Sequence, residues 1–446
     1  MEKGSRLILT STPEQEMTPE NALAVGAHVG ALYHRVAVGR DTAPDSRMIQ
    51  SAFISGLVSA GADAVEVGIA PAPAVCVAFG PEYDAVVMIG SPNEYDAFSS
   101  IMLYNPDGSR FAAERTDQIL EVAGAPLPDY REVGRVHTDH SANLRYQAQL
   151  VLSGLKANGY IILDCGCGSS SLCAPAALAA GGADVASINA HIDGLNAPRS
   201  PGLAKADLSG ISDFVNASVG SIGIAYNGDA TRLAVIDESG KVVSGIHVMA
   251  LMLLFLRPNV AVVPFDAPAL IDYAFRRDIN GNVDDEKTVL QRRLIRTNGT
   301  LADITETIRH NHADLGALAD GTFIFPQYSL CPDAIRASAI ISQLSGVRSI
   351  RTLLASFPTY YTDSEQFHCT DTPEAFGRKL VQKLSEYDIQ EILVADGWRV
   401  SMPHGSFIVA TDSNNPGTIT LQGESTDQIY LVTMMEQAKS IIRACL

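Results

Sequence analysis

Apolar and polar residues alternate along this chain in blocks that predict β-strands and α-helices in turn. Short apolar runs at 36–39, 63–67 and 85–89 are typical of strands buried in a parallel sheet. Longer segments with apolar residues at helical spacing, such as 46–60, follow or precede them. Because strands and helices alternate, we expect an α/β fold with a mainly parallel sheet covered by helices.

The same order of strands and helices occurs three times before the pattern changes. The second unit has strands predicted at 160–163 and 184–188, and the third has strands predicted at 260–264, 289–297 and 322–326. In the last part, two helices, predicted at 372–384 and 426–444, enclose four short strands. The sequence therefore predicts three α/β units followed by a smaller α+β unit.

Capping residues and one apolar run define particular helices. Thr18 is the expected N-cap of the first helix, with Pro19 at its first position, and Ser425 is the expected N-cap of the last helix. The most apolar run, Val248–Leu256, is nine residues long. A run of that length predicts a core helix, because a membrane span needs about 20 apolar residues.

Composition and charge exclude several classes of partner. The 446 residues are 46% hydrophobic and 18% charged, which indicates a globular chain of several domains. The net charge of −18 argues against a nucleic-acid partner or an anionic membrane surface. The start of the chain lacks a run apolar enough for a signal peptide, so we expect a cytoplasmic protein.

Cysteine usage agrees with that compartment. The seven cysteines are odd in number and irregular in spacing, as expected for reduced thiols. Cys165 and Cys167, together with Cys173, could form a metal site, but no second pair or histidine cluster accompanies them. Buried thiols beside a turn are therefore the favoured interpretation.

The stretch 221–240 contains the most informative polar loop. Two predicted strands, 222–225 and 233–236, flank the residues Asn227 to Arg232. Asn227, Asp229 and Thr231 place oxygen atoms at alternate positions, an arrangement that suits Mg²⁺ or a phosphate-bearing partner. Only Asp229 is a carboxylate, so the capacity for metal chemistry is the open question.

Seven motifs, taken in order and spacing, resemble the α-D-phosphohexomutases, the group of phosphomannomutase, phosphoglucomutase and phosphoglucosamine mutase. The carriers of the resemblance are Gly39–Thr42, Gly68–Ala74, Met88–Ile89 leading to Asn105–Gly108, Asp164–Gly168, Gly223–Arg232, Phe325–Leu330 and Asp396-Gly397. The resemblance implies three tandem α/β domains with mixed, mainly parallel sheets and a C-terminal α+β (TBP-like) domain around a central cleft. The implied domains are 1–146, 147–252, 253–362 and 363–446. It also implies a phosphoserine loop, a Mg²⁺ loop, a sugar loop and a phosphate loop, one in each domain.

The serine loop departs from the family pattern T-A-S-H-N-P. In the ungapped reading Pro92 stands at the position of the nucleophile, and proline cannot be phosphorylated. A slip of one residue would give the role to Ser91. A loop-capping role for Ser91 is the alternative. The lysine that usually follows this loop is replaced near Met102, which removes a charge-stabilising group.

The metal loop of the family, D-G-D-x-D-R, has lost two carboxylates. Asn227 and Thr231 replace aspartates, while Asp229 and Arg232 remain. Mg²⁺ normally requires carboxylate charge, so binding through these three residues should be severely weakened. Arg232 either holds a phosphate or pairs with Asp229.

The sugar and phosphate loops have changed as well. Leu318 stands where a glutamate would hold sugar hydroxyls, and Asp320 is the remaining polar candidate in that loop. The phosphate loop lacks its arginine, which leaves Thr411, Ser413 and Asn414 as candidate ligands.

Residues that serve folding match the family, whereas those that serve chemistry mostly differ. We therefore expect a non-catalytic, sugar-phosphate-binding or regulatory homologue, which could pair with an active paralogue or form a homodimer. The alternative is an active phosphomannomutase or phosphoglucomutase, an intramolecular phosphotransferase that uses Ser91 and Mg²⁺. A third interpretation is a changed ligand or reaction in the same cleft.

Overall fold

The computed structural model describes residues 8–10, 16–91, 99–121, 129–193, 198–369, 371–387, 389–395, 397–411 and 417–446. The chain forms two compact units. Unit 1 comprises Met1–Val248 and Asp314–Thr352, and unit 2 comprises Met249–Ala313 and Leu353–Leu446. The chain passes between the units at three points, which lie within α8 (Gly245–Leu256), between Ala313 and Asp314, and within α13 (Ile350–Ala355). The domain boundaries inferred from the sequence stay a prediction.

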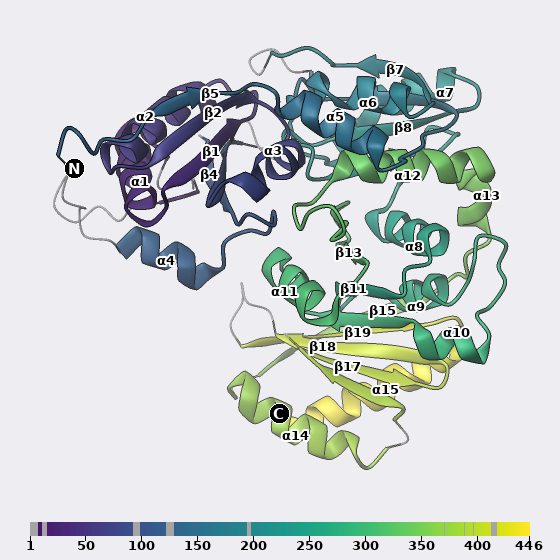
Figure 1. The fold of residues 1–446 in the computed structure, drawn as a ribbon. Coiled ribbons are helices and arrows are strands. Elements are labelled where there is room, and N and C mark those ends of the chain that lie inside the picture. The colour runs from purple at the N-terminus through teal and green to yellow at the C-terminus, as the bar shows by residue number, and fades with distance from the viewer. Residues whose placement is uncertain are drawn as a thin grey trace. The chain divides into compact units, whose positions relative to one another are not determined.

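The first sheet of unit 1 has the strand order β4-β3-β1-β2-β5 (Figure 1). Its strands are β1 (Arg35–Arg40), β2 (Asp63–Ile69), β3 (Ala85–Gly90), β4 (Ser100–Tyr104) and β5 (Val136–Thr138). All neighbours are parallel except β3 and β4, which are antiparallel. Polar residues that follow β1 and β3 therefore meet at one edge of this sheet.

Two helices with unusually close contact cover one face of this sheet. They are α1 (Pro19–Leu32) and α2 (Ser46–Ser59). A Cβ atom at Gly26 would lie 2.1 Å from the carbonyl oxygen of Phe53, and one at Gly56 would lie 1.9 Å from that of Leu23. Glycine is required at both positions, because any side chain would force the two helices apart.

The second sheet of unit 1 has the order β10-β9-β8-β6-β7. Its strands are β6 (Tyr160–Asp164), β7 (Asp184–Ile188), β8 (Ser221–Tyr226), β9 (Leu233–Ile236) and β10 (Val242–Val243). The strands β6, β7 and β8 are parallel, whereas β9 and β10 are antiparallel additions. Unit 1 also contains the short antiparallel pair β13 (Leu315–Ala317) and β14 (Phe323–Ile324). The further helices of unit 1 are α3 (Ala72–Phe79), α4 (Ala113–Glu121), α5 (Ala142–Leu152), α6 (Ala174–Ala180), α7 (Ser209–Ala217) and α12 (Ala334–Val347).

Unit 2 combines a parallel strand pair with a wholly antiparallel sheet. The pair is β11 (Val260–Pro264) and β12 (Arg293–Thr297), accompanied by α9 (Ala269–Phe275), α10 (Glu286–Gln291) and α11 (Leu301–Asn311). The antiparallel sheet has the order β15-β19-β18-β17-β16. Its strands are β15 (Tyr361–His368), β16 (Glu391–Val394), β17 (Gly397–Met402), β18 (Gly405–Thr411) and β19 (Thr418–Ser425). The helices α14 (Pro373–Leu384) and α15 (Gln428–Cys445) pack against it and share its hydrophobic core.

The predicted fold class, mixed α/β with several mainly parallel sheets, is confirmed. The cap at Thr18 is also confirmed, because its side chain accepts a hydrogen bond from the Asn21 amide at 3.2 Å. The predicted cap at Ser425 is wrong. Asp427 caps α15 instead, since its carboxylate accepts from the amides of Ile429 and Tyr430.

Two further observations concern single elements. The strand predicted at 289–297 is shorter than expected, because residues 289–291 belong to α10. The run predicted as a core helix is part of α8, and its residues from Val248 to Leu253 are almost completely buried. No helix in the described part of the chain is both long and apolar enough to cross a membrane.

Candidate functional site

The loop between β8 and β9 buries Asp229 completely. Its Oδ1 accepts hydrogen bonds from Asn227 Nδ2 at 2.9 Å, from the Thr231 hydroxyl at 2.7 Å and from the Thr231 amide at 3.2 Å. The three predicted metal ligands are therefore brought together as the spacing suggested. However, their side chains form hydrogen bonds with one another.

The backbone of this loop is fixed by two helices of unit 1. The Asp229 carbonyl accepts from the amide of Ala72, at the start of α3, at 3.1 Å. The Ala230 carbonyl accepts from the amide of Ala334, the first residue of α12, also at 3.1 Å. Ala230 itself has a left-handed backbone with φ of 56°. These contacts hold the loop in one conformation despite the strain of that φ value.

The residues of the loop do not fit Mg²⁺. Asn227 Oδ1 accepts from the Arg232 amide at 3.0 Å, so it is the amide nitrogen of Asn227 that faces Asp229. An N–H donor cannot coordinate a cation, and the Thr231 hydroxyl donates its proton to Asp229. No group of three or more His, Cys, Asp or Glu side chains within the described ranges could hold a metal ion.

Asp229 acts electrostatically on two residues that the sequence did not single out, the buried Tyr104 and the half-buried Arg110. A bridge between Tyr104 and Arg110 closes the predicted turn at residues 105–108 and returns Arg110 beside β4. The Arg110 guanidinium carbon lies 4.7 Å from the centre of the Tyr104 ring. Burial acts to lower the pKa of Arg110, but Tyr104 and Asp229 outweigh it and hold the pKa above its ordinary value. A basic residue just after a predicted hairpin turn was the available signal.

Asp41 and Ser91 meet at the edge where β1 and β3 end. Asp41 Oδ2 accepts from the Ser91 amide and Oδ1 accepts from the Ala43 amide, both at 2.8 Å. Burial raises the pKa of Asp41 to about 7, and the charge of Asp229 adds to this rise. Arg40 Nη1 donates to the Asp41 carbonyl at 3.3 Å.

The prediction that Arg232 could pair with Asp229 is wrong. Arg232 pairs with Asp320, with 3.1 Å between Nε and Oδ2, and not with Asp229. A β-bridge between Arg232 and Thr322 brings the two loops together within unit 1. Both side chains of the pair are about 40% exposed, at 41% and 40%. A phosphate at Arg232 would therefore compete with a carboxylate already in place.

Several predicted positions lie outside the described residues. They are Pro92 in the serine loop, and Ser413 and Asn414 in the phosphate loop. Thr411 is the last residue of β18, and its side chain is not described. The phosphate loop therefore stays a prediction.

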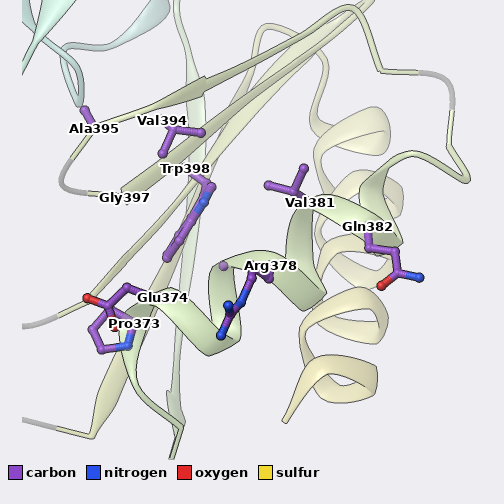
Figure 2. A pocket seen from close by; sticks show the side chains of 10 residues that line it. Pro373, Glu374, Arg378, Val381, Gln382, Val394, Ala395, Gly397 and Trp398 are labelled. Carbon is purple, nitrogen blue, oxygen red and sulfur yellow. The ribbon is translucent and has the colours of Figure 1, made fainter.

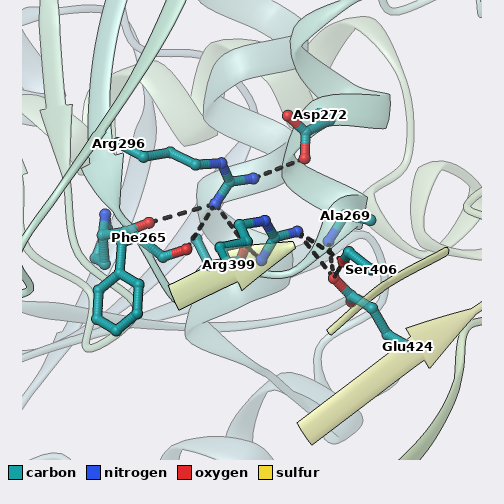
Figure 3. Close-up of polar contacts among 9 residues, drawn as sticks. Phe265, Ala269, Asp272, Arg296, Arg399, Ser406 and Glu424 are labelled. Carbon is teal, nitrogen blue, oxygen red and sulfur yellow. Dashed lines mark hydrogen bonds and ion pairs between the residues drawn. The ribbon is translucent and has the colours of Figure 1, made fainter. Parts of the chain in front are cut away.

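Unit 2 contains an arginine network that the sequence did not reveal. Arg296 Nη1 and Arg399 Nη1 both donate to the Ala267 carbonyl, at 2.6 and 3.1 Å. Arg296 pairs with Asp272 at 2.6 Å, and Arg399 pairs with Glu424 at 3.0 Å (Figure 3). Because both guanidiniums are paired with carboxylates, this network ties α9, β12, β17 and β19 together and leaves little free charge for a ligand.

A cavity of about 1060 Å³ lies between α14 and the strands β16 and β17 of unit 2. Trp398 forms part of its wall, Glu374 lies at the start of α14 and Arg378 lies in the second turn of that helix (Figure 2). The Cβ of a residue larger than glycine at 377 would lie 2.2 Å from the Trp398 ring. None of the predicted site residues lines this cavity.

The seven cysteines are free and buried. Cys167 lies 3.5 Å from His191 Nε2, and burial raises the pKa of Cys167. Burial also raises the pKa of Cys165 to about 12. Raised thiol pKa values are those of structural cysteines and not of thiolate ligands or nucleophiles.

Taken together, the fold and the loops define a multidomain α/β protein whose polar loops follow buried strands. Residues 3–125 match the family model for domain I, alpha/beta/alpha, of phosphoglucomutase/phosphomannomutase. A probable phosphoglucosamine mutase of Methanococcoides burtonii is 31% identical over 443 residues, which cover 97% of this chain and 96% of the relative. The chain belongs to the α-D-phosphohexomutase family.

Other relatives and solved structures agree with this assignment. A probable phosphoglucosamine mutase of Methanocella arvoryzae is 28% identical, with 96% of this chain and 95% of the relative covered. The crystal structure of a phosphoglucomutase/phosphomannomutase family protein from Burkholderia thailandensis has a TM-score of 0.74 at 18% identity, covering 99% of this chain and 98% of that one. A putative phosphomannomutase from Thermus thermophilus has a TM-score of 0.70 at 16% identity, with 97% of each chain covered. At such identities the structural likeness concerns the fold.

Proposed function

We propose that this chain is a phosphohexomutase-family protein that does not transfer phosphoryl groups and that binds a hexose phosphate in a regulatory role. The observation that carries the proposal is the closed loop at Asp229. The amide of Asn227 and the hydroxyl of Thr231 donate to the one carboxylate, where a metal site needs oxygens directed at a cation. Phosphoryl transfer without such a cation lacks the charge that stabilises its transition state.

The changes in the other loops support the first part of this proposal, the loss of phosphoryl transfer. Leu318 cannot accept a hydrogen bond from a sugar, and Arg232 is engaged by Asp320 at 3.1 Å. A regulatory role would be exerted on an active paralogue, or through a homodimer. The protein would then act in the cytoplasm, where hexose phosphates are found.

The decisive experiment is an attempt to phosphorylate the pure protein. It is incubated with Mg²⁺ and glucose 1,6-bisphosphate, and the mass of the peptide that contains Ser91 is measured. Turnover of glucose 1-phosphate, mannose 1-phosphate and glucosamine 6-phosphate is followed in parallel. The phosphoglucosamine mutase of Methanococcus aeolicus, 26% identical to this chain, serves as the positive control. We expect neither phosphate on Ser91 nor turnover, and turnover comparable to that of the control would overturn the proposal.

A second measurement tests ligand binding. Isothermal titration with glucosamine 6-phosphate should give a saturable signal, and free glucosamine should give none, because the phosphate provides the charge to be recognised. Equal heats for the two compounds would argue against a sugar-phosphate ligand.

The second candidate is an active mutase that uses Ser91 with Mg²⁺. The position of Ser91 favours it, since this residue follows β3 and its amide is bonded to Asp41 at 2.8 Å. The similarity to probable phosphoglucosamine mutases favours a phosphoglucosamine substrate in that case. If activity is found, Ser91→Ala must abolish it. Activity that survives this substitution would place the nucleophile elsewhere.

A further inference from the structure

A second cavity of unit 2, with a volume of about 1060 Å³, lies on the face of the antiparallel sheet opposite α14 and α15. Arg399 and Ser401 of β17 line it, whereas the residues at alternate positions, Trp398 and Val400, belong to the core that those helices share. Residues from α9, α10 and β12 form its other wall. A cavity of this volume accommodates a small organic molecule.

Positive charge is concentrated in this cavity, although the chain as a whole carries a net charge of −18. Its lining contains five arginines and three carboxylates, which are Arg276, Arg277, Arg292, Arg296 and Arg399, and Asp272, Asp284 and Glu391. Two of these arginines are compensated, because Arg296 pairs with Asp272 and Arg399 pairs with Glu424 (Figure 3). The excess of positive charge therefore lies with the other three arginines.

The carboxylate of Asp284 is shared by two arginines. Arg257 Nη2 and Arg292 Nη1 each lie 2.5 Å from one of its oxygens. Only 4% of the Arg292 side chain and 2% of the Asp284 side chain are exposed. Arg292 Nη2 is buried and has no hydrogen-bond partner among the described residues. This part of the wall therefore holds one more positive charge than negative, in surroundings that screen charge poorly.

Arg276 and Arg277 add two cations that no carboxylate neutralises in the described structure. Arg276 is exposed, and its side chain forms no hydrogen bond or ion pair with a described residue. The guanidinium carbon of Arg277 lies 3.9 Å from the centre of the Tyr273 ring, and its Nη1 donates to the Tyr273 carbonyl at 3.3 Å. These contacts orient the guanidinium without cancelling its charge. Glu391, the remaining carboxylate of the lining, pairs with neither arginine.

Two neutral groups of the lining can donate hydrogen bonds into the same space. They are the Tyr360 hydroxyl and the His404 ring, neither of which is hydrogen-bonded to a described residue. Burial raises the pKa of Tyr360 to about 12, so its hydroxyl keeps the proton that it would donate. Guanidiniums combined with neutral donors are suited to the oxygens of a phosphate group.

We infer that this cavity binds a phosphate ester of a small polar molecule through Arg276 and Arg277, at a site distinct from the predicted phosphate loop. Gly405, the first residue of β18, lines the cavity, whereas the predicted phosphate loop follows Thr411, the last residue of this strand. The seven residues of the strand span roughly 20 Å. The inference therefore goes beyond the proposed function and does not depend on it.

Isothermal titration of the full chain with glucose 6-phosphate and with AMP tests the inference and distinguishes a sugar phosphate from a nucleotide. At least one of them should give a saturable signal, and glucose and adenosine should give none, because the guanidiniums recognise the phosphate. Inorganic phosphate should bind ~10-fold or more weakly, since it fills only a small part of the cavity. Equal binding of inorganic phosphate would indicate an adventitious ion only and would overturn the inference, as would no binding of either ester.

Arg276→Gln is the critical variant, and Arg293→Gln is its matched control. Both arginines are exposed, belong to unit 2 and have no ion-pair partner among the described residues, but Arg293 does not line the cavity. Arg276→Gln should weaken ester binding by ~10-fold through the loss of a charge-assisted hydrogen bond, and the further change Arg277→Gln should weaken it again. Arg293→Gln should change it by less than ~2-fold, because salt screens exposed charges. Equal losses in Arg276→Gln and Arg293→Gln would overturn the inference.

Arg232→Gln, which alters the predicted site of unit 1, is titrated in parallel. Binding that Arg232→Gln abolishes and Arg276→Gln leaves intact would overturn this inference and support the proposed function. The opposite pattern would support this inference and leave the proposed function without its ligand. Two binding events, each lost in one of the variants, would support both, so the two failures are distinguishable.

Discussion

Asp41→Asn should remove a pH dependence of stability that the buried cluster of unit 1 creates. Asp41 is 2% exposed, and burial raises its pKa to about 7 from the ordinary 3.8. Between these two pH values the folded chain keeps a proton on Asp41 that the unfolded chain releases. The contribution is therefore fully present below about pH 4 and is lost as the pH rises through 7.

The magnitude follows from the difference between the two pKa values. It amounts to roughly three pH units, and each unit corresponds to about 1.4 kcal/mol, so about 4 kcal/mol of stability is lost between pH 4 and pH 7. Asparagine does not titrate. The free energy of unfolding of the natural chain, minus that of Asp41→Asn, should therefore fall by most of this amount over the same interval.

The assay is urea unfolding followed by far-UV circular dichroism at half-unit steps from pH 4 to pH 8. Circular dichroism is needed because Trp398, the only tryptophan, lies in unit 2 and does not report on unit 1. Asp84→Asn is the control. The Asp84 carboxylate also accepts two backbone N–H bonds, at 3.0 and 2.9 Å, but it is exposed, so its difference from the natural chain should stay constant. A constant difference for Asp41→Asn as well would refute the reasoning.

Three further predictions concern other buried contacts. Arg199→Met should destabilise unit 1 by about 3–5 kcal/mol in urea unfolding, because it leaves the buried carboxylate of Asp164, 2.8 Å from Arg199, without its counter-charge. A cost below about 1 kcal/mol would contradict this prediction. Gly377→Ala should cost about 1–3 kcal/mol by overpacking against Trp398, and the fluorescence of that tryptophan should change; an unchanged spectrum would show that the ring has room to move. Asn227→Asp should lower the melting temperature in EDTA, because a second carboxylate meets Asp229, and Mg²⁺ should restore it. A melting temperature indifferent to Mg²⁺ would show that two carboxylates are not enough to recreate the metal site.

The sequence was sufficient to predict features that depend on residues close together in the chain. Thr18 was predicted as a cap because its side chain bonds an amide three residues away, and the structure has that bond. The prediction at Ser425 missed by two residues, because Ser425 accepts from the Asp427 amide and Asp427 then caps the helix. Val289 and Leu290 carry apolar side chains that suit a strand or a helix, and the structure places both in the helix α10.

For the candidate site, the sequence determined the secondary structure around the polar loop. The strand, the polar loop and the second strand around Asp229 follow from apolar runs and spacing, which depend on neighbours in the chain. The tertiary structure alone decided what surrounds that carboxylate. Arg110, Tyr104 and Asp41 lie 119 to 188 positions away along the chain, and only the packing of several segments in unit 1 lets the charge of Asp229 contribute to raising their pKa values. Burial and long-range charge determine the chemistry of the site, and neither can be predicted from the local pattern of residues.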